Sequence, residues 1–174
     1  MHIAAQPEIV QGLPVLELGA GLGSVGLTAA QVGASHVTLV DREPLALHCA
    51  MSTARLCGLP TVAVGVENPP VGSVSATAAD WANVSTESHV SVVLGAEVLY
   101  DPTDVPALAR CAAQLLRHGG TLLITDPTQE RRAGCRAALL AEACKLGGSA
   151  SESTLRIPDS ASSVVLLSVN FGPQ

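Results

Sequence analysis

The stretch ELGAGLG at residues 17–23 decides the fold of this chain. A buried strand, Pro14 to Leu18, must turn here into a helix that begins near Ser24. The alternating glycines Gly19, Gly21 and Gly23 allow positive φ angles and keep Cβ atoms away from a ligand. The helix that follows presents free N–H groups and positive partial charge at the same place. Such a turn is typical of nucleotide-like cofactor sites in α/β sheets.

Asp41, which follows the next apolar strand, indicates the kind of cofactor. A carboxylate about 20 residues after the glycine turn commonly accepts hydrogen bonds from ribose hydroxyls. Dinucleotide binding requires G-x-G-x-x-G directly after the strand, and counting from Gly19 places Ser24 where the third glycine belongs. Counting from Gly21 fits Gly26, but the loop then begins two residues late.

Glu17, at the carboxyl end of the first strand, separates the candidate cofactors further. A carboxylate there repels the pyrophosphate of a dinucleotide and suits a cationic ligand. S-adenosylmethionine carries an ammonium, a sulfonium and a ribose, and it has no phosphate. The glycine segment therefore favours S-adenosylmethionine over NAD, and a nucleotide-cofactor oxidoreductase is the competing enzyme class.

The composition fits a single domain over residues 1–174. Apolar residues make up 48% and aromatic residues 2%, so the interior must be built from Ala, Val and Leu, as in a parallel sheet between helices. No apolar run reaches the length of a membrane span and no signal peptide is evident, so we expect a cytoplasmic or nuclear protein. The net charge of −6 argues against an extensive nucleic-acid surface. The five cysteines form no C-x-x-C pair, and no metal site is predicted.

Strand and helix signals alternate along the chain. We predict strands at 14–18, 36–40, 61–66, 90–94, 121–125, 154–157 and 164–169, and helices at 25–32, 44–57, 104–117 and 129–146. Residues 67–75, with two prolines and a glycine, are predicted to form a loop. The pattern indicates a Rossmann-like α/β fold, a doubly wound, mostly parallel seven-stranded sheet with a C-terminal antiparallel hairpin. Ligands bind such sheets beyond the carboxyl ends of the strands.

Four segments in order carry a family resemblance: residues 15–26, Asp41, the pair Asp80-Trp81, and GAEVLYDP at 95–102. Together they resemble the seven-β-strand, class I S-adenosylmethionine-dependent methyltransferases. Within that class the chain is most similar to the methyltransferase-like 21 group of protein-lysine methyltransferases. The resemblance spans roughly residues 13 to 147 and implies methyl transfer to a protein side chain, with lysine as the expected target.

The resemblance also implies which residues bind the cofactor. The methionine end would be lined by Glu17, Gly19, Gly21 and Gly23. Asp41 would hold the ribose hydroxyls, and Asp80 and Trp81 would contact the adenine, with the indole packed on the ring. Ala96, just after the predicted fourth strand, would leave room for the cofactor. Two alternatives stay open: Trp81 fills a gap in the core, and Asp41 caps the next helix.

Glu97 and Tyr100 are the candidate catalytic residues. The family commonly has Asp-x-x-Tyr where this chain has Glu97-Val98-Leu99-Tyr100. Methyl transfer requires a neutral amine, whereas a lysine pKa of about 10.4 leaves roughly one amine in 10³ neutral at pH 7. We assign Tyr100 to substrate positioning and Glu97 to orientation or proton acceptance. The alternative is a half-buried tyrosine ring and a solvated glutamate that caps the strand.

The resemblance further implies a protein substrate, and we expect a monomer. Only about 13 residues precede the first strand, whereas relatives usually carry a longer N-terminal region that covers the cofactor. We expect residues 1–13 to be the remainder of such a region. A non-catalytic or truncated binding module with the methyltransferase fold is therefore the main alternative to an active enzyme.

Overall fold

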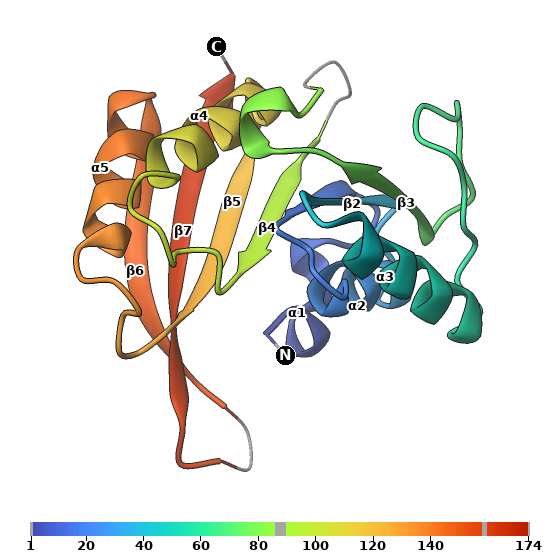
Figure 1. The fold of residues 1–174 in the computed structure, drawn as a ribbon, viewed down its shortest axis with the longest axis horizontal. Coiled ribbons are helices and arrows are strands. Elements are labelled where there is room, and N and C mark those ends of the chain that lie inside the picture. The colour runs from blue at the N-terminus through green and yellow to red at the C-terminus, as the bar shows by residue number, and fades with distance from the viewer. Residues whose placement is uncertain (1, 86–89, 158–159, 174) are drawn as a thin grey trace.

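The computed structural model describes residues 2–85, 90–157 and 160–173, and it has a seven-stranded sheet covered by helices on both faces (Figure 1). The strands are β1 (Pro14–Leu18), β2 (His36–Asp41), β3 (Ser73–Ala78), β4 (Val92–Ala96), β5 (His118–Pro127), β6 (Gly148–Arg156) and β7 (Ser163–Pro173). The α-helices are α1 (His2–Ala5), α2 (Ser24–Gln31), α3 (Pro44–Leu56), α4 (Val105–Leu115) and α5 (Cys135–Lys145), and the 3-10 helices are η1 (Pro7–Ile9) and η2 (Trp81–Asn83).

The strand order β3-β2-β1-β4-β5-β7-β6 confirms the predicted doubly wound sheet. β7 runs antiparallel to both of its neighbours, β5 and β6, while β1 to β5 pair in parallel. The chain leaves β3 at one edge and returns to β4 beside β1. The carboxyl ends of β1 and β4 therefore meet at the switch point, which is where open α/β sheets bind ligands.

Each face of the sheet is buried in its own apolar core. Leu18, Val93 and Ile124 face α4 and α5, whereas Leu39 and Leu94 face α1, α2 and α3. Strands buried on both faces explain why their sequences are continuously apolar. Aliphatic side chains and alanines fill both cores, as the low aromatic content predicted.

The predicted third strand is wrong. Residues 61–66 make only an isolated bridge, Thr61 to Val74, and β3 instead begins at Ser73, inside the predicted loop. Gly65 interrupts the β-branched stretch with a φ of +80°, so that stretch cannot continue as a regular strand. Polar side chains also join β3 to β2, and a pattern of apolar residues does not predict such contacts. The two ring nitrogens of His36 lie 2.8 Å from the Ser73 hydroxyl and 3.0 Å from the Ser75 hydroxyl.

The β6–β7 hairpin is longer than predicted and extends past the end of β4 (Figure 1). Ala96, the last residue of β4, pairs with Thr125 of β5, which pairs with Leu166 of β7. The pairs Val164 to Pro127 and Val164 to Leu155 lie farther along, so this end of the hairpin forms an arm beside the carboxyl edge of the sheet. Among the described residues, no helix is long and apolar enough to cross a membrane.

Candidate functional site

The glycine loop between β1 and α2 has the backbone geometry that the sequence predicted. Gly19, Gly21 and Gly23 have φ angles of +66°, +52° and +74°. A Cβ at Gly19 would lie 2.7 Å from a methyl carbon of Val98, so only glycine lets this loop approach the end of β4. A Cβ at Gly21 would meet nothing within 4 Å, which leaves the outer side of the loop open to a ligand.

Asp41 lies at the end of β2 and holds the glycine loop in place. Its Oδ2 accepts a 2.7 Å hydrogen bond from the Gly21 N–H, and its Oδ1 accepts one of 2.9 Å from the Glu43 N–H. The N-cap of α3 is Glu43, whose carboxylate accepts from the Leu45 N–H at 3.2 Å, so the alternative of Asp41 as the cap is wrong. The Asp41 side chain is partly exposed, so its lone pairs remain accessible to ribose hydroxyls.

Glu17 lies beneath the loop rather than on its ligand side. It is 2% exposed, and its carboxylate accepts a 2.8 Å hydrogen bond from the Gly26 N–H in the first turn of α2. Burial raises the pKa of Glu17 from 4.5 to about 7; the Gly26 hydrogen bond opposes this shift and the charge of Asp41 adds to it. Glu17 thus fixes the strand–helix turn, and its direct contact with a cofactor stays a prediction.

Asp80 and Trp81 line the same cavity as Gly19 of the glycine loop and Asp41. The Asp80 carboxylate caps η2 by accepting from the Ala82 N–H at 3.1 Å. Trp81 is half-buried and packs against the core that includes the residues of α4, and a Cβ at Gly19 would lie 3.6 Å from its ring. The structure brings five of the predicted residues around one cavity of about 40 Å³: Gly19, Asp41, Asp80, Trp81 and Tyr100.

Tyr100 is thereby placed with the predicted cofactor residues. Its side chain is 39% exposed and lines the cavity beside Asp41 and Trp81. At about 40 Å³ the cavity is far smaller than a site for a whole cofactor, so a cofactor lying over the glycine loop would place only one of its groups here, beside Tyr100. The predicted role of Tyr100 toward the substrate stays a prediction. Ala96 is the last residue of β4 rather than the residue after it, because the strand lies two residues later than predicted.

Glu97 stands where β4 ends, with a left-handed φ of +55° that only one other non-glycine residue adopts among those described. Its N–H donates to the Thr125 carbonyl at 2.8 Å, which ties the turn to β5. The carboxylate projects outward and forms an ion pair with Arg131, and both side chains are about half exposed. Glu97 is therefore available to a cationic group that displaces the arginine, since exposed ion pairs contribute little stability.

A buried charge cluster at the end of β5 was not predicted. Asp126 is 2% exposed, and neither of its carboxylate oxygens makes a hydrogen bond within the described chain; the Arg136 guanidinium lies 3.2 Å away. Burial raises the pKa of Asp126, and the charge of Arg136 opposes this. Arg136 also donates to the Thr128 carbonyl at 2.8 Å, while Glu130 accepts from the N–H groups of Gly134 and Arg136 at 2.9 Å each.

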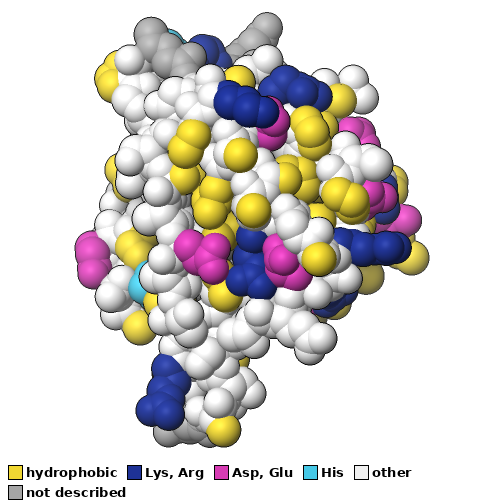
Figure 2. All heavy atoms as spheres, turned by 90° about the vertical axis from the view of Figure 1, so that its left-hand side faces the viewer, with side chains coloured by type: hydrophobic (Ala, Val, Ile, Leu, Met, Phe, Trp, Pro, Cys, Tyr) yellow, Lys and Arg dark blue, Asp and Glu magenta, His cyan; other side chains and the backbone are white. Residues whose placement is uncertain are grey.

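Arg136 and Glu130 thus order the β5–α5 loop that brings Arg131 to Glu97. The available sequence signal was an acid at the end of a strand, the same signal that identified Asp41. Figure 2, which faces α5 and β6, shows acidic and basic side chains interspersed rather than separated by sign. Within the described residues, no cluster of three or more His, Cys, Asp or Glu could hold a metal ion.

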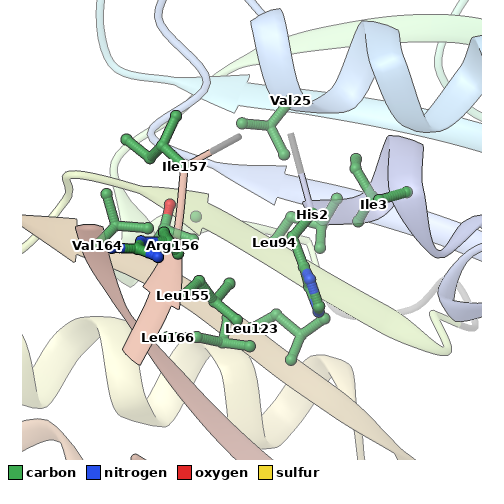
Figure 3. Close-up of a pocket in the computed structure, with 13 residues that line it drawn as sticks. His2, Ile3, Val25, Leu94, Leu123, Leu155, Arg156, Ile157, Val164 and Leu166 are labelled. Carbon is green, nitrogen blue, oxygen red and sulfur yellow. The ribbon is translucent and has the colours of Figure 1, made fainter. Parts of the chain in front are cut away.

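A second, larger cavity of about 350 Å³ lies on the α2 side of the same edge. Figure 3 shows the leucines of its floor facing a space bounded by Val25 of α2, Ile157 of the hairpin arm, and α1. The lining residues are His2, Ile3, Ala5, Val25, Leu94, Gly95, Leu123, Thr125, Leu155, Arg156, Ile157, Val164 and Leu166. No local sequence pattern indicates this cavity, because its residues come from six separate elements and from the loop after β6.

A family model for lysine methyltransferases matches residues 2–134, which include the glycine loop and every predicted site residue. The chain belongs to the lysine methyltransferase family. Two relatives support this assignment, both described as protein N-lysine methyltransferase METTL21A. The protein from Xenopus tropicalis is 29% identical over 76% of this chain, and that from Danio rerio is 31% identical over 66%. The family resemblance found in the sequence is confirmed.

The chain spans about half the length of these relatives: the match covers 57% of the Xenopus tropicalis protein and 49% of the Danio rerio protein. Solved structures share its fold at lower identity. Magnesium protoporphyrin IX methyltransferase from Synechocystis, with bound SAM, has a TM-score of 0.69 and 17% identity over 98% of this chain and 76% of its own. The N-methyltransferase NodS from Bradyrhizobium japonicum, with S-adenosylhomocysteine, has a TM-score of 0.70 and 17% identity over 99% and 84%.

Proposed function

We propose that this chain binds S-adenosylmethionine at the carboxyl edge of its sheet and transfers the methyl group to a lysine of an acceptor protein. The observation that carries the proposal is the convergence of Gly19, Asp41, Asp80 and Trp81 on one cavity in a member of the lysine methyltransferase family. The relatives named protein N-lysine methyltransferase support the choice of acceptor.

The residues present suit this cofactor. Gly21 leaves the loop open, Asp41 has lone pairs for ribose hydroxyls, and Trp81 offers an aromatic face to adenine. The buried Glu17 beneath the glycine loop disfavours a pyrophosphate. When bound, S-adenosylmethionine supplies an electrophilic methyl group on its sulfonium. The protein has then to orient the acceptor amine and accept its proton.

Glu97 is the group proposed to hold the acceptor. Its left-handed backbone directs the carboxylate outward at the end of β4, beside the strand end of the glycine loop. An acceptor ammonium would replace Arg131 on this carboxylate and could then lose its proton to it or to water. Glu97→Gln is expected to lower turnover with little change in cofactor affinity. Unchanged turnover would remove the proposed role.

Cofactor binding can be tested with a matched pair of glycine variants. Gly21 and Gly12 both have positive φ, +52° and +72°, and a Cβ at either position meets nothing within 4 Å. Gly21→Ala would project a methyl group toward the cofactor, whereas Gly12→Ala carries the same backbone strain away from it. S-adenosylhomocysteine at millimolar concentration should raise the melting temperature of the wild type and of Gly12→Ala, and should not raise that of Gly21→Ala.

Methyl transfer is tested by incubating the protein with methyl-labelled S-adenosylmethionine and cell lysate. Labelled lysine in an acceptor band supports the proposed enzyme. Stabilisation by S-adenosylhomocysteine without any labelled band would favour a non-catalytic binding module. A melting temperature that rises with NAD(H) and not with S-adenosylhomocysteine would instead favour an oxidoreductase.

A further inference from the structure

The ion pair between Glu97 and Arg131 is exposed, but the backbone on each side of it is held in place. The Glu97 N–H donates to the Thr125 carbonyl at 2.8 Å, which fixes the turn that carries this carboxylate. Arg131 lies in the β5–α5 loop, residues 128–134, directly after Glu130. Both side chains of the pair are 55% exposed, so an approaching cation can reach the carboxylate.

Glu130 fixes the backbone next to this arginine. Its carboxylate accepts hydrogen bonds of 2.9 Å from the N–H groups of Gly134 and Arg136, so one side chain closes the loop onto the first turn of α5. The hydrogen bonds from Arg136 and Gly134 hold the pKa of Glu130 below its usual range, and the carboxylate therefore stays ionised at neutral pH.

The Arg136 guanidinium holds the start of the loop. This side chain is 13% exposed and donates to the Thr128 carbonyl at 2.8 Å. Its Nε lies 3.2 Å from the Asp126 carboxylate and 3.4 Å from that of Glu130. The first and third residues of the loop thus contact the same side chain. Because the loop is already ordered, its exposed arginine loses little further conformational entropy when it pairs.

We propose that Glu130 and Arg136 are positioning residues that hold Arg131 on Glu97 as an internal competitor of the acceptor lysine. The proposal rests on the proposed function and adds a regulation of the same site. An exposed ion pair of ordinary strength keeps the arginine on the carboxylate in roughly 60–85% of molecules. Only the remaining molecules present a free carboxylate, which weakens the apparent affinity for the acceptor roughly two- to sixfold.

The competitor makes the exposed Glu97 carboxylate selective. An isolated lysine on a protein surface offers a single cation, as Arg131 does, but the arginine belongs to the same chain and is present at a high effective concentration. The acceptor therefore needs contacts beyond its ammonium to displace the arginine. Lysines that approach Glu97 without such contacts are excluded.

The experiment uses capped decalysine as the acceptor probe, because it presents many amines on one chain. Protein saturated with S-adenosylhomocysteine and labelled with ¹³C in its Glu carboxyl groups is titrated with the probe. The Cδ resonance of Glu97, assigned with Glu97→Gln, gives the half-saturating concentration without any turnover. Methyl-labelled S-adenosylmethionine with the same probe gives kcat and KM separately.

The first pair of variants tests the competitor itself. Arg131→Gln should lower the half-saturating concentration of decalysine, and its KM, roughly two- to sixfold without lowering kcat. Arg132→Gln makes the same charge change at the next residue, which is also exposed, and should have a smaller effect. The difference between the two variants removes the general attraction of a polycation to a more acidic protein.

The second pair tests the positioning residues. Glu130→Ala should lower the half-saturating concentration relative to Glu142→Ala, which removes a carboxylate that pairs with Lys145 at the opposite end of α5. In the Arg131→Gln background the two alanine variants should not differ, because the competitor is already gone. If Glu130→Ala does not fold, Arg136→Lys replaces it, since it keeps the charge and removes the forked donor.

The outcomes separate this inference from the proposed function. A Glu130→Ala effect that persists in the Arg131→Gln background would reduce Glu130 to a purely structural role and overturn the inference, even if decalysine is methylated. Equal half-saturating concentrations in Arg131→Gln and Arg132→Gln would overturn it as well. A Glu97 resonance that decalysine shifts in no variant would remove both the acceptor role and the competitor. The expected pattern of shifts without methyl transfer to decalysine or to lysate proteins would support the competitor and refute the methyltransferase activity.

Discussion

The buried carboxyl of Glu17 should make the free energy of unfolding depend on pH, and this dependence can be measured directly. The carboxyl is 2% exposed, and burial raises its pKa from 4.5 to about 7. Between these values the unfolded chain ionises Glu17 while the folded chain keeps it protonated, so folding loses stability as pH rises through this window. The loss is complete above pH 7, and such a pKa difference corresponds to about 3 kcal/mol.

Glu17→Gln removes the ionisable group and keeps an oxygen that can accept from the Gly26 N–H. The variant should therefore gain stability relative to wild type by about 2.5 kcal/mol between pH 5 and pH 8. Urea unfolding of both proteins at the two pH values measures this difference, and contributions from all other groups largely cancel. Glu8→Gln, at an exposed position, controls for the loss of one carboxyl. If the free energy of unfolding of Glu17→Gln differs from that of the wild type by the same amount at both pH values, Glu17 does not have a raised pKa in the folded protein.

Three further predictions concern the charged residues of the site. Asp41→Asn replaces one of two acceptor oxygens and should lower the free energy of unfolding by about 1–2 kcal/mol in urea; an unchanged value would contradict its role in holding the loop. Arg131→Gln should change the free energy of unfolding by less than about 1 kcal/mol, because its ion pair with Glu97 is exposed. It should lower the KM for the acceptor in methyl-transfer assays, because Glu97 becomes accessible. A raised KM would assign Arg131 to substrate binding. Arg136→Met leaves Asp126 buried without its counter-charge and should cost about 3 kcal/mol at pH 8. That cost should shrink on acidification, since burial raises the Asp126 pKa, and a pH-independent cost would contradict the charge argument.

The sequence predicted the sheet well wherever apolar strands and glycine turns coincide. β1 and β2 and the helices that follow them lie where the pattern placed them, because two-sided burial demands continuous apolar residues. β5 contains the predicted strand 121–125 and extends beyond it at both ends. β3 and most of β6 were missed for one reason: they are edge strands of small or polar residues. Their pairing depends on hydroxyl contacts such as those of His36 and on neighbouring strands, which a local pattern does not contain.

Some residues of the candidate site could likewise be predicted from the sequence, and others could not. Residues fixed by a single strand end, such as Asp41 and Trp81, could be identified because each closes a recognisable segment. The inward direction of Glu17 could not be predicted, since it depends on the Gly26 N–H lying beneath the loop. Asp126 was missed because its partner Arg136 lies on the following helix and pairs with it only in the folded chain.

The apolar cavity, the buried charge cluster and Glu97 all contact the carboxyl end of β5. Consecutive side chains on a strand point to opposite faces, so Thr125 faces the apolar cavity while Asp126 faces the buried charge cluster. The register Ala96 to Thr125 then ties the left-handed turn at Glu97 to the Thr125 carbonyl, and the Glu97 carboxylate pairs with Arg131 on the side of the charge cluster. A slip of one residue between β4 and β5 would reverse both faces at once. The positions of the apolar cavity and of the buried charge cluster at this edge are therefore set by a single strand register.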